Sequence, residues 1–280
     1  MRLYLRFPIL LLAISGLSGS VHAQSQLTAD QIMERVAANQ DRAEELRRQY
    51  VYKQHIHVVS RKTNGKLMRE ENADYDVFPN DQGSSKKLVQ LVGKYWDKGS
   101  YHEYREPQQD CDGIDGDLVS DLRQDLADEK KSRDGLSGDL FPLTSAQQRQ
   151  YRFERLSDQK LNGREVYRIA FKPKDKSDSA WAGEALIDKE EFQPVMVFTK
   201  LSRKIPLLVR TTLGTDVPGV GFSVTYKRQP DGIWFPASFG TEFRLKALFF
   251  INRDISVSLL NSDFERTHVE SKIHYGAESR

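Results

Sequence analysis

Hydrophobic and polar residues alternate along much of this 280-residue chain, and the pattern is clearest in its last third. Between residues 235 and 251 most apolar side chains share one parity, while polar residues such as Glu242 and Arg244 occupy the other. Residues 255–259 repeat the pattern. In a β-strand this alternation directs one set of side chains to a core and the other to water. The pattern predicts an antiparallel sheet that is covered on a single face.

Roughly ten strands are expected, separated by turns rich in Asp, Gly and Pro. Their predicted ranges are 50–60, 67–78, 87–96, 101–105, 151–157, 165–172, 181–188, 194–201, 221–228 and 233–246. Asn64-Gly65 and Asn162-Gly163 predict two tight hairpins, because this dipeptide accepts the positive φ angles of such turns. A sheet with this many strands curls instead of staying flat, so we expect it to approach a barrel.

A helix is predicted near the start of the sheet region, over residues 29–48. Thr28 and Gln31 have the spacing of a capping box, in which each side chain accepts a hydrogen bond from the other residue's backbone. Apolar or small residues then recur at steps of three and four, at Ile32, Val36, Asn39, Ala43 and Leu46. Such a helix has one apolar stripe, which requires a sheet to pack against.

Residues 107–147 interrupt the strand pattern and are predicted to form an insertion or lid across one end of the sheet. Residues 107–117 are polar and typical of turns, residues 118–131 predict a charged helix that begins near Ser120, and residues 135–143 are expected to be irregular.

These elements predict a mainly β (α+β) fold with a large antiparallel sheet that curves toward a barrel, an N-terminal helix that lies on it, and a partly helical insertion. One helix of about 20 residues is too small to cover such a sheet, so part of the concave face is expected to hold a ligand or to be covered by the insertion. The expected ligand-binding residues are Trp181, Ile187, Val195, Val197, Phe222, Val224, Tyr226, Phe239 and Phe243. Ile205, Leu207 and Leu208, between basic residues, are candidates for a lid or rim. The alternative is that the same apolar residues form a closed core.

The first 23 residues are predicted to be a cleavable signal peptide. Arg2 and Arg6 precede an apolar stretch that is too short to span a bilayer, and Val21-His22-Ala23 has the small residues of a cleavage site. Gln24 follows, so the cysteine that would carry a lipid anchor is not at that position. We expect an exported protein with one domain at residues 24–280, no transmembrane segment, and a disordered tail at residues 267–280.

Removal of the leader makes the chain electrically neutral. The full sequence has 42 basic and 40 acidic residues, and the leader contains two arginines and no acid. A neutral chain has no net positive field for binding nucleic acid, which is therefore not expected as a partner. Cys111 is the single cysteine, so the fold cannot contain an internal disulfide.

The residues that are typical of catalysis or metal binding do not form a recognisable motif. His55 and His57 would lie on one face of a strand and could supply two metal ligands, but no third ligand is identifiable. Asp110, Asp112, Asp115 and Asp117 could bind Ca²⁺, although Ile114 breaks the EF-hand pattern and a solvated acidic turn is the simpler interpretation. We expect no enzymatic activity, no metal and no cofactor.

Three consecutive strand motifs resemble a known family. They are Val166–Lys174, which contains Phe-Lys-Pro, Trp181–Asp188, which ends in Ile-Asp, and the Pro-Val pair at residues 194–195; a Gly-Ile-Trp-Phe-Pro element follows at residues 232–236. They resemble the periplasmic lipoprotein-carrier (outer-membrane lipoprotein-sorting) superfamily, over residues 28–100 and 150–265. The resemblance implies a mainly β fold in which the large curved antiparallel sheet forms a half-open barrel around the N-terminal helix, with an apolar concavity that shelters acyl chains. Residues 107–147 make this chain longer than a typical carrier, and the carrier's functional arginine has no identifiable counterpart.

The favoured hypothesis is an exported carrier or binding protein that holds an acyl chain or a lipidated protein. The alternative is a periplasmic regulatory or scaffolding protein of the same fold, which binds another protein through its sheet edges or through the insertion.

Overall fold

The computed structural model describes residues 26–80, 83–107, 113–127, 141–175, 181–201, 215–216, 221–247 and 251–267. The predicted signal peptide, Cys111 and residues 268–280 of the predicted tail lie outside the described residues, as do the rim candidates Ile205, Leu207 and Leu208.

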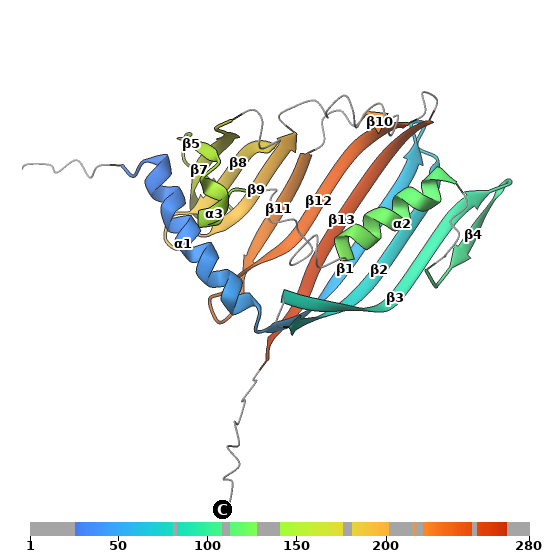
Figure 1. Ribbon diagram of the computed structural model, residues 1–280, viewed down its shortest axis with the longest axis horizontal. Helices are drawn as coiled ribbons and strands as arrows, with labels where there is room; N and C mark the ends of the chain where they lie inside the picture. The colour runs from blue at the N-terminus through green and yellow to red at the C-terminus, as the bar shows by residue number, and fades with distance from the viewer. Residues whose placement is uncertain are drawn as a thin grey trace, which may run out of the picture.

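Thirteen strands of the described chain form one antiparallel sheet (Figure 1). They are β1 (Tyr50–Lys62), β2 (Leu67–Asn80), β3 (Gly83–Asp97), β4 (Ser100–Tyr104), β5 (Tyr151–Arg155), β6 (Gln159–Leu161), β7 (Arg164–Pro173), β8 (Trp181–Asp188), β9 (Pro194–Leu201), β10 (Thr215–Asp216), β11 (Gly221–Arg228), β12 (Trp234–Ala247) and β13 (Ile251–Arg266). Their order is β4-β3-β2-β1-β13-β12-β11-β9-β8-β7-β5, with β10 on β12 and β6 on β7. The two ends of the sheet, β4 and β5, do not pair, so the sheet is open, as the predicted half-open barrel requires.

One row of apolar side chains crosses nine strands, from β3 to β7, on the inner face of the sheet. The row consists of directly opposed residues: Leu91, Ala73, Ile56, Leu259, Phe239, Val224, Val197, Ala185 and Ile169. None of these side chains is more than 5% exposed. Because strand pairing keeps opposed residues on the same face, the alternation in each sequence segment adds up to one continuous core.

Helices cover this inner face from two sides (Figure 1). The helix α1 (Ala29–Arg47) contacts β5 and the short α3 (Ser145–Gln148), and α2 (Ile114–Ala127) packs on β1 and β2. Ile32, Met33 and Val36 of α1 and Val119 of α2 are buried in the same apolar cluster as the row across the sheet. The mainly β fold with an N-terminal helix and a partly helical insertion is therefore confirmed.

Local signals were accurate at the start of α1 and at the hairpins. Thr28 and Gln31 form the predicted capping box. Asn162 and Gly163 adopt φ angles of 49° and 82°, which is the conformation that the Asn-Gly dipeptide favours in a tight hairpin.

The start of α2 was predicted wrongly. The helix begins at Ile114 and not near Ser120, because Gly113 turns the chain at φ 89° and its carbonyl accepts hydrogen bonds from Gly116 and Asp117. Asp115 and Asp117 then lie in the first turn, where acidic residues are favourable to the helix dipole.

Candidate functional site

The predicted ligand-binding residues lie on the inner face of the sheet, on strands β8, β9, β11 and β12. Ile187, Val197, Val224 and Phe239 are buried in the core cluster, and Phe222, Tyr226 and Phe243 are partly exposed and pack against it. Trp181 and Val195 are also partly exposed, and strand alternation directs them to the same face. The structure therefore brings the nine residues to one surface, and their binding role stays a prediction.

An aromatic ladder links the strands of this surface. The ring centroids of Trp181 and Phe222 lie 4.8 Å apart in an edge contact, and those of Phe222 and Phe239 lie 5.2 Å apart in a stacked contact. Contacts of this kind add about 0.5–1.5 kcal/mol to the burial of the rings. The ladder therefore gives the surface a fixed shape along its row from β8 to β12.

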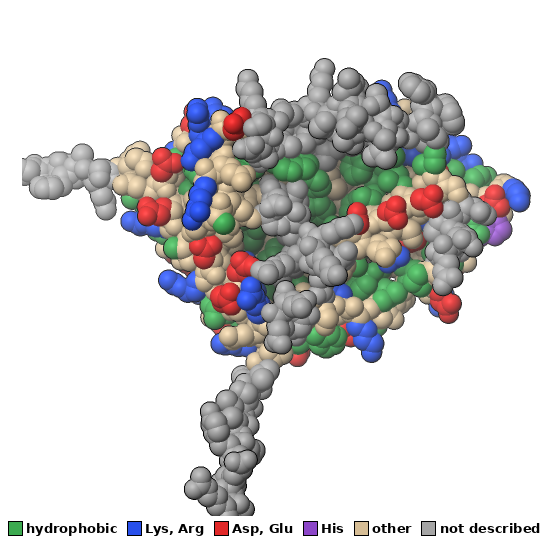
Figure 2. Space-filling model, in the orientation of Figure 1, with side chains coloured by type: hydrophobic (Ala, Val, Ile, Leu, Met, Phe, Trp, Pro, Cys, Tyr) green, Lys and Arg blue, Asp and Glu red, His purple; other side chains and the backbone are tan. Residues whose placement is uncertain are grey.

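Exposure divides the nine residues into a floor and an accessible layer. The fully buried side chains of Ile187, Val197 and Val224 support the sheet and cannot touch a ligand without rearrangement. The larger side chains of Trp181, Phe222, Tyr226 and Phe243 keep part of their surface accessible. Figure 2 shows hydrophobic side chains in the hollow between α1 and α2, over strands β11 to β13. We refer to this surface as the inner apolar face.

Charged residues at the inner face are used to hold α2. At its first turn, Asp115 accepts hydrogen bonds from Arg253 Nε at 2.6 Å, from Arg253 Nη2 at 2.7 Å and from Ser60 Oγ at 2.6 Å. At its last turn, the carbonyl of Leu126 accepts a hydrogen bond from Lys86 Nζ at 3.0 Å. Asp115 therefore serves helix docking, which differs from the calcium ligand considered from the sequence; Asp110 and Asp112 lie outside the described residues.

A buried polar cluster holds the middle of α2. The carboxylate of Glu71 accepts hydrogen bonds from Arg123 Nε at 2.6 Å, from Tyr104 Oη at 2.6 Å and from Arg69 Nη2 at 3.3 Å. Arg123 Nη1 also donates to Tyr75 Oη at 3.0 Å.

The surroundings raise the pKa values of Tyr104 and Arg123, which keeps the tyrosine neutral and the arginine charged. Burial, reinforced by the adjacent Glu71 carboxylate, raises the pKa of Tyr104 well above its usual range, so its hydroxyl remains a donor. Burial alone would lower the pKa of Arg123, but its contacts with Tyr75 and Glu71 outweigh that effect and raise it. We did not predict this cluster, although the sequence contains a signal for it. Arg69 and Glu71 share the strand parity of Leu67, Ala73 and Val77, which are buried.

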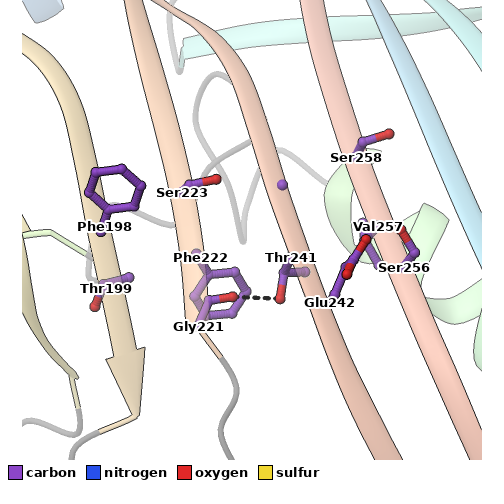
Figure 3. A pocket seen from close by; sticks show the side chains of 11 residues that line it. Phe198, Thr199, Gly221, Phe222, Ser223, Thr241, Glu242, Ser256, Val257 and Ser258 are labelled. Carbon is purple, nitrogen blue, oxygen red and sulfur yellow. Dashed lines mark hydrogen bonds between the residues drawn. The ribbon is translucent and has the colours of Figure 1, made fainter. Parts of the chain in front are cut away.

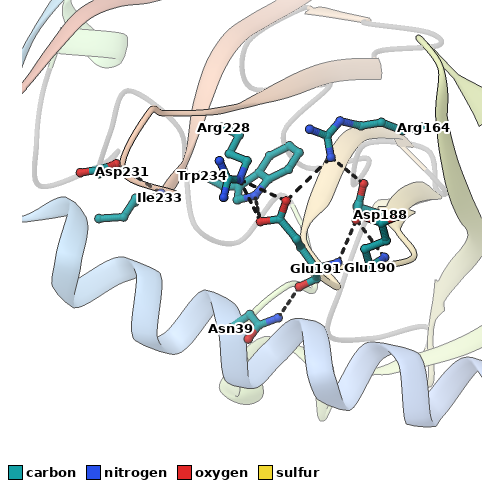
Figure 4. Close-up of polar contacts among 9 residues, drawn as sticks. All are labelled: Asn39, Arg164, Asp188, Glu190, Glu191, Arg228, Asp231, Ile233 and Trp234. Atoms are coloured by element: carbon teal, nitrogen blue, oxygen red, sulfur yellow. Dashed lines mark hydrogen bonds and ion pairs between the residues drawn. The ribbon is translucent and has the colours of Figure 1, made fainter.

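A second polar group anchors α1 to the opposite part of the sheet (Figure 4). Glu191, in the turn between β8 and β9, accepts hydrogen bonds from Trp234 Nε1 at 3.0 Å and from Arg228 Nε at 3.1 Å. Asn39 of α1 donates to the Glu191 carbonyl at 2.9 Å, and Arg164 donates to Asp188 at 2.9 Å. The Glu191 backbone N–H also donates to Asp188 at 2.8 Å, so two residues of the strand motifs, Asp188 and Trp234, are joined through Glu191.

Each of the two histidines on β1 lies beside a carboxylate of the neighbouring strand β2. His55 Nδ1 lies 2.7 Å from Asp74 Oδ1, and His57 Nε2 lies 2.7 Å from Glu70 Oε1. Within the described ranges, no group of three or more His, Cys, Asp or Glu residues is arranged to hold a metal ion. Among the same residues, no helix has the length and apolarity needed to cross a bilayer.

Comparison with known proteins gives distant structural similarities only. No protein-family model and no curated protein sequence matches this chain. Similar solved structures include a domain described as an outer membrane lipoprotein-sorting protein from Vibrio parahaemolyticus, at 13% identity and a TM-score of 0.40, covering 87% of this chain and 95% of that chain. Another is a LolA superfamily protein from Nitrosomonas europaea, at 11% identity and a TM-score of 0.35, covering 87% and 96%.

The complex of MucA and MucB from Pseudomonas aeruginosa is also similar, at 11% identity and a TM-score of 0.22, covering 84% of this chain and 99% of the matched chain. The first two of these structures are described with the same lipoprotein-sorting family that the strand motifs resemble. Identities and TM-scores this low do not transfer the function of these proteins to this chain.

Proposed function

We propose that this chain is an exported carrier or binding protein that holds an acyl chain, free or attached to a lipidated protein, on its inner apolar face. The observation that carries the proposal is the accessible layer of Trp181, Phe222, Tyr226 and Phe243, which lies on the same face as the closed core and between two helices. A partly exposed apolar surface of this kind is costly in water unless a ligand or partner covers it.

The chemistry of the inner apolar face favours an alkyl ligand over a polar one. The nine predicted residues contain two polar side-chain groups, the Trp181 indole and the Tyr226 hydroxyl, and no ionisable carboxylate or amine. The buried charges of Glu71 and Arg123 are satisfied by each other and by tyrosine hydroxyls under α2. A ligand would therefore gain its affinity from buried methylene groups, each of which contributes about 0.8 kcal/mol.

The predicted export is compatible with a lipid carrier. The predicted signal peptide would deliver the protein to the aqueous periplasm, where lipids cannot diffuse freely between two membranes. The predicted cleavage before Gln24 would leave the chain without a lipid anchor, which suits a mobile carrier better than a membrane-fixed acceptor.

The proposal is tested with protein purified without detergent. Native mass spectrometry should show co-purified lipid, and a fluorescent fatty acid should bind and be displaced by unlabelled fatty acid. Phe222→Ala should weaken binding, whereas Phe198→Ala, on the adjacent strand and the opposite face, should not. Thermal unfolding of both variants controls for loss of fold. Absence of both lipid and displacement in the folded wild-type protein would refute the proposal.

A regulatory or scaffolding role is the second candidate, and the edge strand β4 favours it. Among the described strands β4 pairs with β3 alone, and its residues Ser100 to Glu103 are exposed. An exposed edge can accept a strand from a partner protein. Loss of partner binding with retained fatty-acid binding after substitutions in β4 would support this role, and the converse result would support the carrier.

A further inference from the structure

The outer face of the sheet contains a groove that the acyl-chain proposal does not use. Most of its lining residues are opposite in parity to the inner row, and register places four of these side by side across β9, β11, β12 and β13: Phe198, Ser223, Gly240 and Ser258. The groove has a volume of about 520 Å³ (Figure 3). It exists because glycine and serine side chains are too short to fill the space that larger residues would occupy.

Phe198 lines this groove, and a second exposed apolar side chain, Leu260, lies near it. Phe198 is 44% exposed, and Leu260, two residues beyond Ser258 on the same face, is 52% exposed. Phe198 is directly opposed to Ser223, and Ser223 to Gly240, so the exposed ring and the bare glycine are two strands apart in one row. The face thus contains both a protruding group and a depression.

The adjacent row contains two opposite charges. Lys200 is directly opposed to Gly221, whose position for a Cβ lies 3.6 Å from the Lys200 Cβ. Extending the pairing of Ser223 with Gly240 by two residues sets Gly221 beside Glu242, and Thr241 Oγ1 donates a hydrogen bond to the Gly221 carbonyl at 2.7 Å. Lys200 and Glu242 therefore flank Gly221 on the outer face. Both are exposed, and neither has an ion-pair partner within the part of the chain that the structure describes.

We propose that the outer face binds a second copy of this chain about a two-fold axis that runs along β11. Such an axis places β9 of one copy over β12 of the other. Phe198 then covers Gly240 of the second copy, and Lys200 faces Glu242 of the second copy. Because a two-fold interface is isologous, each of these contacts occurs twice.

The second copy is favoured over another protein because both halves of the fit lie on this one surface. One two-fold axis brings Phe198 over Gly240 and Lys200 over Glu242. The positions of these four residues follow from strand pairing and were not chosen to fit the axis. Burial of Phe198 supplies apolar area, and the charge pairs give the contact its orientation and specificity.

The dimer and the acyl-binding proposal depend on opposite faces of the sheet. Phe198 and Val197 are neighbours in sequence, but strand alternation directs the first outward and the second into the core. Each proposal can therefore fail while the other holds.

The test uses charge reversal and sedimentation velocity over a wide concentration range. The wild-type protein should form a dimer, and Lys200→Glu and Glu242→Lys should each weaken dimerisation by about tenfold or more, since like charges would then face each other twice. An equimolar mixture of the two variants should restore the dimer, because each contact again joins opposite charges. Phe198→Ser should also lose the dimer, and Lys87→Glu, on distant β3, should keep it.

Restoration in the mixture also shows that both variants are folded. A wild-type protein that is monomeric at every concentration would overturn the proposal, whether or not a small molecule occupies the groove. So would a dimer that persists in both single variants, or a mixture that stays monomeric.

Discussion

Arg123 of α2 donates a hydrogen bond to Glu71 of β2 at 2.6 Å, and both side chains are buried. The other donors to Glu71 are Tyr104 of β4 and Arg69 of β2. The Arg123 hydrogen bond therefore joins α2 to the half of the sheet that contains β2 and β4.

Removal of either partner should strongly destabilise the protein. Arg123→Met leaves the Glu71 carboxylate buried with one charged donor fewer, and an uncompensated buried charge costs about 3–5 kcal/mol. Chemical denaturation measures the change in the free energy of unfolding. Arg244→Met, which removes an exposed ion pair with Asp254, is the matched control and should change it far less, because solvent screens that pair. Similar effects of the two substitutions would contradict the prediction.

Gly93 and Tyr104 should be energetically coupled. A Cβ on Gly93 would lie 2.1 Å from the Tyr104 ring, which donates its hydroxyl to Glu71. Gly93→Ala should therefore destabilise the wild-type protein by about 1–3 kcal/mol through overpacking. In a Tyr104→Ala background the same substitution should cost much less. A double-mutant cycle of unfolding free energies measures the coupling, and additive effects would exclude the contact.

The α1 anchor predicts a specific effect at Trp234. Trp234→Phe keeps an aromatic ring in place but removes the indole donor to Glu191, so unfolding free energy should fall by about 1–2 kcal/mol. In a Glu191→Ala background the substitution should have a smaller effect, because the acceptor is already gone. Equal effects in both backgrounds would show that ring packing, and not the hydrogen bond, is responsible.

Acid should weaken the contact that Asp158 makes near the start of α1. Burial alone would raise the pKa of Asp158, but hydrogen bonds from Arg155 and Lys189 outweigh it and hold the pKa below its usual value. A pKa that is lower in the folded state stabilises the protein at pH values above the unfolded pKa, about 3.9, and this stabilisation is lost as pH falls through the lower folded value. The difference in unfolding free energy between wild type and Asp158→Asn should therefore shrink in acid. A difference that is constant from neutral pH to below pH 3.9 would contradict this assignment.

Affinity for fatty acids should depend on chain length if the inner apolar face is the binding surface. Each methylene that enters the site adds about 0.8 kcal/mol, which is roughly fourfold in affinity, until the hollow is full. Competition against a fluorescent fatty acid measures the series. Affinity that does not vary with chain length would show that the headgroup, and not the alkyl chain, is recognised.

Much of the fold could be predicted because its signals are local. The alternation in β12 and β13, the capping box at Thr28 and the Asn162-Gly163 turn each depend on a few neighbouring residues. The nine residues proposed for the inner apolar face were also found by parity alone. The start of α2 was missed because a run of aspartates and glycines is equally typical of a turn, and only the hydrogen bonds to Gly113 select the helix.

The sequence by itself indicated which side chains share a face within a regular strand, since a strand has a period of two; this rule fails where the pairing shifts register, as between Thr225 and Tyr226. Only the tertiary structure decided which strands are neighbours, and therefore which residues meet. It joined Glu71 to Arg123 across 52 positions of sequence and Asp115 to Arg253 across 138. It also aligned Lys200, Gly221 and Glu242 on the outer face. Contacts of this range depend on strand order and register, which result from the packing of the whole sheet and leave no local pattern in the chain.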